Sequence, residues 1–193
     1  MNSLYAVMAS LPYLKWGDRP PMDFPQFEQW VSNSLSQRIL EGLHALRESA
    51  SSQAAGLPGS GMFAIWRHFD WQFRTALAWE RRKRLGWEDS PELATPAIDQ
   101  PNADLQYQAR LALDHADPLE CERAIELVRW SFLDNAAAGH YFDIEALVCW
   151  WLKLGILWRL DSFRDLEGEA TFHRFHVAIS DSIKEYFRKE VTQ

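Results

Sequence analysis

Two histidines near the C-terminus are the residues best suited to bind a metal ion. His173 and His176 are three residues apart, so a helix would place both on one face. A zinc site needs three or four ligands, and no cysteine, histidine or carboxylate stands at a recognised spacing from this pair. A surface or half-buried pair is the favoured interpretation, and we predict no metal site.

Other catalytic patterns are incomplete or missing in the sequence. Glu41 and His44 match one half of the Glu-x-x-His pattern of di-iron bundles, but no second copy of it exists. There is no G-x-S-x-G nucleophile elbow, no G-x-G-x-x-G fingerprint and no G-x-x-x-x-G-K-[ST] phosphate loop. We therefore expect a protein that is not an enzyme, with no catalytic residue and no cofactor.

The densest charged stretch is Glu80-Arg81-Arg82-Lys83-Arg84. Four successive cations surround a helix, so some of them must border its packed face. At the end of a helix, cations also interact favourably with the last carbonyl groups, which is a structural, solubilising role. The functional alternative is a docking patch for an acidic protein surface.

Asp70 and Arg74 lie one helical turn apart in the same region, among aromatic residues. An exposed pair of this kind stabilises a helix by only about 0.2–0.5 kcal/mol. A buried pair is instead a specificity device that is costly to break. The sequence leaves both interpretations open.

The composition narrows the classes of partner. The 193 residues include 20 Lys and Arg against 27 Asp and Glu, a formal net charge of −7. Because sequence-independent binding of nucleic acid needs a basic surface, we expect no nucleic-acid partner. Two cysteines, Cys121 and Cys149, are too few for a disulfide framework and indicate a reducing, cytoplasmic setting. The most apolar stretch, 144–160, contains three charged residues, which favours a core helix over a membrane span.

Ten tryptophans are the most unusual feature of the composition. Aromatic residues at helical spacing are typical of a core or an interface, because each buries about 150–250 Å². Three of them, Trp66, Trp151 and Trp158, lie on predicted apolar stripes of helices. Three others, Trp71, Trp79 and Trp150, lie beside these stripes. We expect the first group in the core and the second on a broad packing or docking face.

The apolar periodicity predicts an all-α chain of long helices, a multi-helix bundle without strands. The expected helices cover 23–49, 62–85, 104–113, 117–139, 144–160 and 166–189, and segment 4–14 is compatible with a helix or a strand. Asp117-Pro118 and Asp143 are start signals, and Gly86 is a stop signal.

We expect one helical domain over residues 1–193, with an internal linker at 49–61, where small residues, glycine and proline gather. The linker allows two sub-lobes, about 1–50 with 120–193, and 60–115. Phe69-Asp70 and Phe142-Asp143 each stand at the start of an aromatic-rich pattern, as expected for two related lobes.

The chain resembles an uncharacterised bacterial family that is typically encoded beside the genes of V/A-type ATPases. The resemblance lies in LYAVMASLP (residues 4–12) followed by Gly17-Asp18 and Pro20-Pro21, and in the stretches 69–86 (FDWQFRTALAWERRKRLG) and 134–160. The last two stretches are also distantly similar to helices of the C subunit of V/A-type ATPases, which is called d in the eukaryotic pump. Apolar, arginine and glycine positions carry the match, not a catalytic signature.

The resemblance implies an all-helical protein without enzymatic chemistry of its own. In V/A-type ATPases the C subunit caps the membrane rotor ring and receives the central stalk, and it is longer than this chain. The resemblance thus implies a non-catalytic adaptor or accessory subunit of a rotary ATPase, with rotor or central-stalk partners. It would lie in the cytoplasm, peripheral to the inner face of the membrane. The positions expected to serve docking or structure are Asp70, Arg74, Arg81, Arg82, Lys83, Arg84 and Gly86.

Two other functions remain open from the residues alone. The chain is also compatible with a stand-alone helical interaction module, whose basic helix end binds an acidic partner. The third hypothesis is a helical bundle that binds a small ligand through its histidine and tryptophan side chains.

Overall fold

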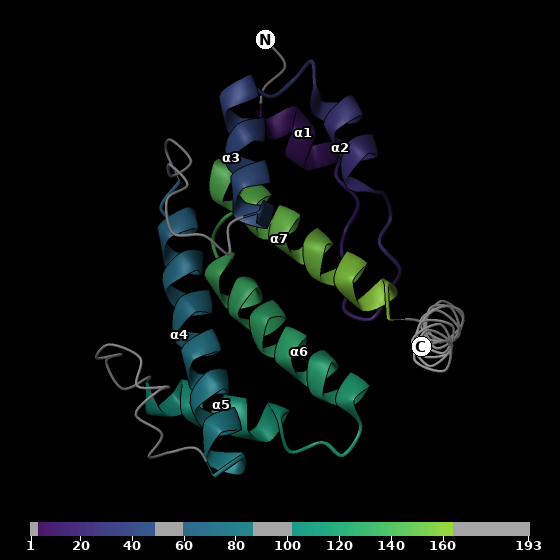
Figure 1. The fold of residues 1–193 in the computed structure, drawn as a ribbon. Coiled ribbons are helices and arrows are strands. Elements are labelled where there is room, and N and C mark those ends of the chain that lie inside the picture. Colours follow the sequence, from purple (N-terminus) through teal and green to yellow (C-terminus); the bar gives the residue numbers. More distant parts are fainter. Residues whose placement is uncertain (1–3, 49–59, 87–101, 164–193) are drawn as a thin grey trace, which may run out of the picture. The chain divides into compact units, whose positions relative to one another are not determined.

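The computed structural model describes residues 4–48, 60–86 and 102–163, and this part of the chain is entirely helical, without strands. In chain order the helices are α1 (Leu4–Ser10), α2 (Phe24–Val31), α3 (Gln37–Glu48), α4 (Met62–Arg84), α5 (Ala103–Ala112), α6 (Pro118–Ala136) and α7 (Ile144–Asp161) (Figure 1). The expected all-α class is therefore confirmed for the described residues. The helix predicted over 166–189 lies outside them, and so do His173 and His176.

The chain divides into two compact units, residues 1–158 and 159–193. The packing described below belongs to the first unit; of the second, only residues 159–163 are described. No helix in the described ranges combines the length and the apolar character needed to cross a bilayer.

Aspartates precede α2 and α6 and cap them, and the start signal at Asp117-Pro118 forms as predicted. Asp23 and Gln26 make a capping box, in which the Asp23 carboxylate accepts from Gln26 N at 2.7 Å and Gln26 Oε1 accepts from Asp23 N at 3.0 Å. Asp117 accepts from Leu119 N at 2.9 Å and so caps α6. A short polar side chain before the helix thus satisfies the first free N–H groups of α2 and of α6.

Asp143 caps α7 by accepting a hydrogen bond from Ala146 N at 2.9 Å. Its other carboxylate oxygen lies 2.6 Å from His140 Nδ1. Partial desolvation raises the pKa of Asp143, but the Ala146 N–H and the His140 ring outweigh it and hold the pKa below its usual value. The carboxylate therefore stays ionised, which favours the helix N-terminus it caps.

The single helix predicted over 23–49 is wrong, because α2 and α3 are separate helices. The polar run Ser32-Asn33-Ser34 lies between them, and such side chains compete with the backbone for helical hydrogen bonds. Leu35 N still donates to Val31 O, whereas the next helix begins where Ser36 O accepts from Ile39 N and Leu40 N. Val31 and Leu35 remain buried across the break.

A second correction concerns the suggested internal repeat. Asp143 stands at the N-cap of α7, but Asp70 lies in the middle of α4, which begins eight residues earlier, at Met62. Met62, Phe63 and Trp66, which precede Asp70 in this helix, are buried. The two Phe-Asp pairs thus occupy different positions in their helices. The proposed division into sub-lobes stays a prediction.

The most apolar helix, α7, forms the core beneath the N-terminal segments. Phe27 of α2 stacks on Trp150 with ring centroids 5.4 Å apart and contacts Trp151 at 4.9 Å. Three indole N–H groups of α7 donate to backbone carbonyls far away in sequence: Trp150 to Pro12 O, Trp151 to Leu43 O and Trp158 to Met22 O, at 2.8–2.9 Å. Since buried carbonyls need a partner, these bonds fix the positions of the first three helices on α7.

Cys149 lies in the same helix and is fully buried. Burial raises the pKa of its thiol to about 11. The side chain is therefore a small hydrophobe and not a reactive thiolate.

The remaining described helices, α4, α5 and α6, pack against one another. The rings of Phe69 (α4) and Phe132 (α6) are nearly parallel, with centroids 3.7 Å apart, and Trp66 lies 6.1 Å from Phe132. Lys153 of α7 pairs with Asp134 of α6 and lies 5.3 Å from the Trp130 ring. Two apolar residues, Ile65 of α4 and Leu85 directly after it, are exposed.

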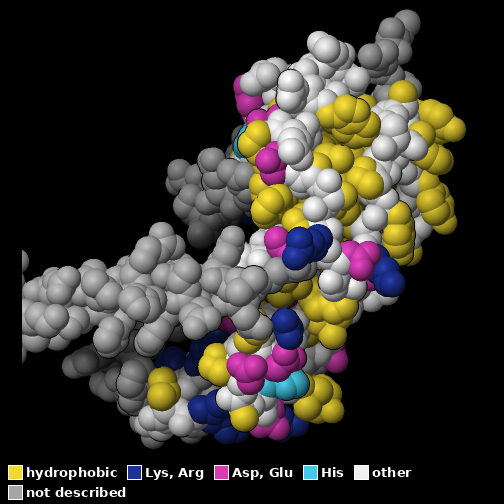
Figure 2. Space-filling view, turned by 90° about the vertical axis from the view of Figure 1, so that its right-hand side faces the viewer, with side chains coloured by type: hydrophobic (Ala, Val, Ile, Leu, Met, Phe, Trp, Pro, Cys, Tyr) yellow, Lys and Arg dark blue, Asp and Glu magenta, His cyan; other side chains and the backbone are white. Residues whose placement is uncertain are grey.

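The surface aromatics are not confined to α4. On the face shown in Figure 2, hydrophobic side chains gather in the upper part, while charged side chains of both signs mix below them. Tyr5, Tyr13 and Trp30 of the N-terminal part are all exposed. An aromatic excess in the sequence is therefore shared between core and surface.

The role of the buried indoles can be tested with Trp151→Phe. The change removes the hydrogen bond to Leu43 O and leaves a void, so we expect a loss of about 2–4 kcal/mol in the free energy of unfolding. Urea denaturation followed by far-ultraviolet circular dichroism measures it. The matched control, Trp71→Phe on the exposed face of α4, should stay within about 0.5 kcal/mol of the parent. Equal effects of both substitutions would contradict the assignment.

Candidate functional site

Asp70 and Arg74 belong to a chain of charges that joins α4 to α6. Arg74 Nε lies 2.7 Å from one oxygen of Asp70, and Arg129 Nε lies 3.0 Å from the other. Arg129 Nη1 then reaches Glu126 Oε1 at 2.8 Å. The side chains of Asp70 and Arg129 are only 14% and 13% exposed, and that of Glu126 is 3% exposed. Of the two interpretations left open by the sequence, the buried one holds for Asp70.

This network is a positioning device between two helices. A carboxylate as buried as Glu126 is stable only when a charged partner and hydrogen bonds compensate for its lost hydration. Arg129 compensates two acids at once, and its guanidinium also lies 5.8 Å from the centre of the Phe73 ring. Asp70 is thereby assigned a structural role, while Arg74, at the outer end of the network, has a 54% exposed side chain.

The sequence reasoning missed Glu126 and Arg129. The available signal was their register, because residues 126, 129 and 133 are spaced as i, i+3 and i+7, and Leu133 lies in the core. Because Glu126 and Arg129 share a helix face with the buried Leu133, their spacing indicates an ion pair inside the fold and not a solvated helix face.

The basic end of α4 divides into residues with and without a structural role. Arg84 donates to Leu113 O, and its Nη2 lies 3.2 Å from Arg110 O. Since α5 ends at Ala112, this guanidinium caps the free carbonyls at the C-terminus of α5. Gly86 has a φ of +67°, a left-handed conformation that ends α4 as predicted.

The other cations of this stretch differ in exposure. Arg81 and Lys83 are exposed, whereas Arg82 is half-buried and its Nε atom is buried. Trp71 and Trp79 are 51% and 48% exposed on the same helix. We call Trp71, Trp79, Arg81 and Lys83 the aromatic-basic surface, which extends around the helix because Arg81 and Lys83, two residues apart, lie on opposite sides of it.

The N-terminus of α4 is capped by a side chain from α7. The cap position, Gly61, has no side chain, and the Glu145 carboxylate takes its place. It accepts from Gly61 N at 2.7 Å, from Met62 N at 3.0 Å and from Ser60 Oγ. An anion at this point also favours the partial positive charge of the helix end. No signal in the sequence predicts this contact, since Glu145 is more than eighty residues from its partners.

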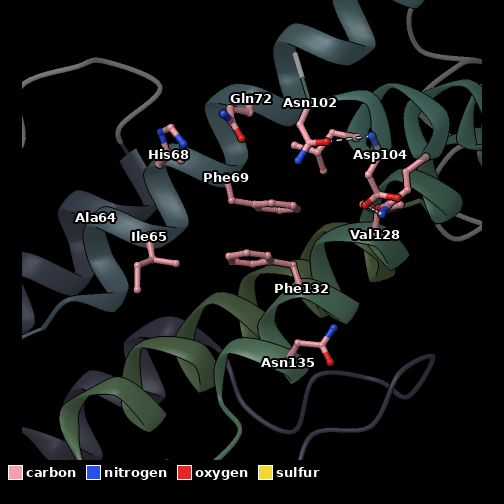
Figure 3. Close-up of a pocket in the computed structure, with 12 residues that line it drawn as sticks. Ala64, Ile65, His68, Phe69, Gln72, Asn102, Asp104, Val128, Phe132 and Asn135 are labelled. Carbon is pink, nitrogen blue, oxygen red and sulfur yellow. Dashed lines mark hydrogen bonds between the residues drawn. The ribbon is translucent and has the colours of Figure 1, made fainter. Parts of the chain in front are cut away.

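A groove of about 630 Å³ lies between α4, α6 and the start of α5 (Figure 3). Phe69 and Phe132 stack face to face in it, while the side chains of His68 and Gln72 come from α4 and that of Asn135 from α6. Asn102 caps α5 by accepting from Asp104 N at 3.0 Å, and Asp104 accepts from Gln108 at 2.7 Å.

The groove offers apolar contacts, amide and imidazole hydrogen-bonding groups and one carboxylate, that of Asp104. Its volume falls in the range of small-molecule sites, about 300–1,000 Å³. The described lining residues are mainly apolar and amide side chains, with His68 and Asp104 as the ionisable groups.

The half di-iron pattern does not form a site in the structure. His44 Nε2 lies 3.1 Å from Glu28 Oε1, and its ring meets the Trp151 ring edge-on, whereas Glu41 is exposed. Within the described ranges no three His, Cys, Asp or Glu side chains come close enough to hold a metal ion.

Comparison with known proteins relates part of the chain to a family. A family model described as a protein of unknown function (DUF2764) matches residues 105–183, which is less than half of the chain. The matched region includes all of α6 and α7 and most of α5. No curated protein and no solved structure matches the chain.

The charge network predicts that a second substitution restores stability that a first one removes. Arg129→Met removes the guanidinium that pairs with the buried Glu126, so we expect a loss of about 3–5 kcal/mol in the free energy of unfolding. Adding Glu126→Gln removes the buried charge and should recover a large part of that loss. Chemical denaturation of the three proteins measures the effect. Arg123→Met, which removes a half-exposed arginine from the same helix, is the control and should change little. A double variant no more stable than Arg129→Met would contradict the assignment.

The cap supplied by Glu145 makes a local prediction. Glu145→Ala leaves the first N–H groups of α4 without an acceptor, which should cost about 1–2 kcal/mol. The backbone amides of Gly61 and Met62 should lose protection in hydrogen exchange, while amides in the middle of α4 keep theirs. Glu145→Gln, which retains an acceptor oxygen, should show a smaller effect. Unchanged exchange at both amides in the alanine variant would show that the cap is unimportant.

Proposed function

We propose that the chain is a non-catalytic helical adaptor or accessory subunit of a bacterial V/A-type rotary ATPase, which links or assembles rotor and stalk parts. In this role it would act in the cytoplasm, at the inner face of the membrane through its partners. The ion transport and ATP hydrolysis would belong to the complex and not to this chain.

The observation that carries the proposal is that residues 69–86 divide into side chains with structural roles and side chains that are exposed. This is one of the three segments that resemble the ATPase-associated family. Asp70, Arg84 and Gly86 have structural roles inside the fold, as described above. The aromatic-basic surface of the same helix remains exposed. Tryptophan and arginine are the side chains most enriched at binding hot spots, so this surface is suited to a protein partner.

Charge supports an acidic partner. The chain has a net charge of −7, yet one helix end gathers four cations in succession. Arg84 is engaged at the end of α5, whereas Arg81 and Lys83 are exposed on different sides of the helix. Cations gathered at one helix end of a chain with the opposite net charge attract an acidic partner to that end and speed association.

The proposal is tested by affinity purification of the tagged chain from its native host in mild detergent. We expect V/A-type ATPase rotor or central-stalk subunits to co-purify, with the yield of the complex falling at high salt because exposed ion pairs are screened. The control is a similarly tagged, unrelated cytoplasmic protein of similar size. Absence of every ATPase subunit from the purified material would refute the proposal.

The same purification separates the remaining hypotheses. Recovery of a different acidic protein, without ATPase subunits, would favour a stand-alone interaction module. Recovery of the chain alone with a bound small molecule would favour the groove between α4 and α6 as a ligand site.

A further inference from the structure

We propose that the outer face of α4 binds an acidic α-helix of the partner, in the manner of one seam of a coiled coil. This inference deepens the proposed function and rests on it for the identity of the partner. It names which part of α4 makes the contact and which chemistry the partner must present.

The outer face of α4 carries a regular seven-residue pattern. Arginine recurs at positions 67, 74 and 81, and apolar residues recur at 64, 71, 78 and 85. We call these seven positions the heptad stripe: Ala64, Arg67, Trp71, Arg74, Ala78, Arg81 and Leu85. The spacing alternates three and four residues, which is the a/d spacing of coiled coils.

The structure places the first six positions of this stripe on one side of the continuous helix α4, and the seventh, Leu85, is its C-cap residue. Seven residues make nearly two turns, so corresponding positions drift by only about 20° per heptad. Six of the seven residues are exposed, and Arg67 is half-buried, with its guanidinium 5.8 Å from the Phe63 ring. Phe69, Phe73 and Ala76, on the opposite side of α4, are buried. The helix is therefore amphipathic in an unusual way, with an aliphatic and aromatic core face and an arginine-apolar outer face.

The residue types of the heptad stripe indicate which kind of partner binds it. Equivalent arginines lie about 10.5 Å apart along the axis, and a second helix with a carboxylate at every seventh residue repeats at the same distance. Arginine pairs with carboxylates through a planar fork, which suits it to ion pairs at an interface. The small residues Ala64, one heptad before Trp71, and Ala78, between Trp71 and Leu85, leave room for large apolar side chains of the partner.

One arginine of the stripe is already held in place. Arg74 Nε lies 2.7 Å from Asp70, whose other oxygen is fixed by Arg129. A side chain that is ordered before binding loses less conformational entropy when the partner arrives. The buried network between α4 and α6 thus supports the central arginine of the binding face.

The pattern favours a protein helix over an anionic membrane surface. Interfacial helices bind in proportion to their buried apolar area, and two of the four apolar positions in the stripe are alanine, which offers little area. Alanine instead permits close approach of a second helix. The net charge of −7 further opposes general binding to anionic surfaces.

The test uses a synthetic, fluorescently labelled helix of four heptads as the probe, with leucine at every a position and glutamate at every d position. Fluorescence anisotropy with the full chain should show saturable binding that weakens as salt is added. A second peptide, with lysine in place of each glutamate, should bind at least about tenfold more weakly, because like charges then face each other. Equal binding of the two peptides would overturn the inference.

Variants locate the contact. Trp71→Ala with Arg81→Glu should weaken binding of the acidic peptide at least about tenfold. Ala78→Glu is a second variant that keeps the helix stable, since glutamate is a good helix former, and it should weaken binding by a similar factor. The matched control is Tyr107→Ala with Arg110→Glu on α5, which also removes an exposed aromatic residue and reverses an arginine. Wild-type affinity of both stripe variants would overturn the inference.

Two further measurements, vesicle binding and co-purification, distinguish a failure of this inference from a failure of the proposed function. If vesicles containing phosphatidylserine bind the chain through the stripe and the acidic peptide does not, the membrane replaces the helix as occupant and the inference is wrong. If ATPase subunits co-purify equally well with the Trp71→Ala, Arg81→Glu variant, the proposed function stands and the inference fails. If the acidic peptide binds through the stripe but no ATPase subunit co-purifies, the inference stands and the proposed function fails.

Discussion

The burial of α7 is the constraint on which the other described parts of the first unit depend. Its side chains meet the N-terminal helices through Phe27 and three indole hydrogen bonds, the start of α4 through Glu145, and α6 through Lys153. An apolar helix must bury all its faces, and a chain of this size can do so only by wrapping several segments around it. The tryptophans serve this purpose well, because each combines a large apolar body with one donor that can satisfy a distant carbonyl.

A second feature of the fold is that two helix ends are completed by side chains from other elements. Glu145 of α7 accepts from the first N–H groups of α4, and Arg84 of α4 donates to the last carbonyls of α5. Each contact satisfies backbone groups that a helix cannot satisfy by itself. The same contacts also fix the register of one helix against the next, so they contribute specificity as well as stability. Charged residues in this protein therefore hold the helices in position as much as they solvate the surface.

The sequence predicted the helical elements well where local signals exist. Asp23, Asp117 and Asp143 precede helices and cap them, and Gly86 ends α4, because each acts on backbone groups within a few residues. Periodicity failed at Ser32–Ser34, where an apolar stripe continues across a break in the backbone. A stripe with helical spacing reports which residues are buried, and it does not report that the backbone between them is continuous.

The candidate site was predictable only in part, since its contacts join residues distant in sequence. Asp70 and Arg74 were recognisable as a pair one turn apart, but Arg129, which decides that Asp70 is buried, is 59 residues away. Glu145 was visible only as a charge in an apolar helix. Sequence alone could group the four cations of the basic end, yet it could not show that Arg84 is engaged at α5 while Arg81 is exposed.

The division of α4 into an inner and an outer face is what gives functional meaning to its charges. Once the residues with structural roles are set aside, the outer arginines are not a random solubilising set, because they repeat with the period that keeps them on one side of the helix. A helix end that served only solubility would need no such spacing and no exposed tryptophan or leucine between the charges. The buried network strengthens this argument, since Asp70 orders Arg74 at the centre of the stripe from inside the fold. The physical chemistry of α4 thus favours a surface built to meet a second helix of opposite charge.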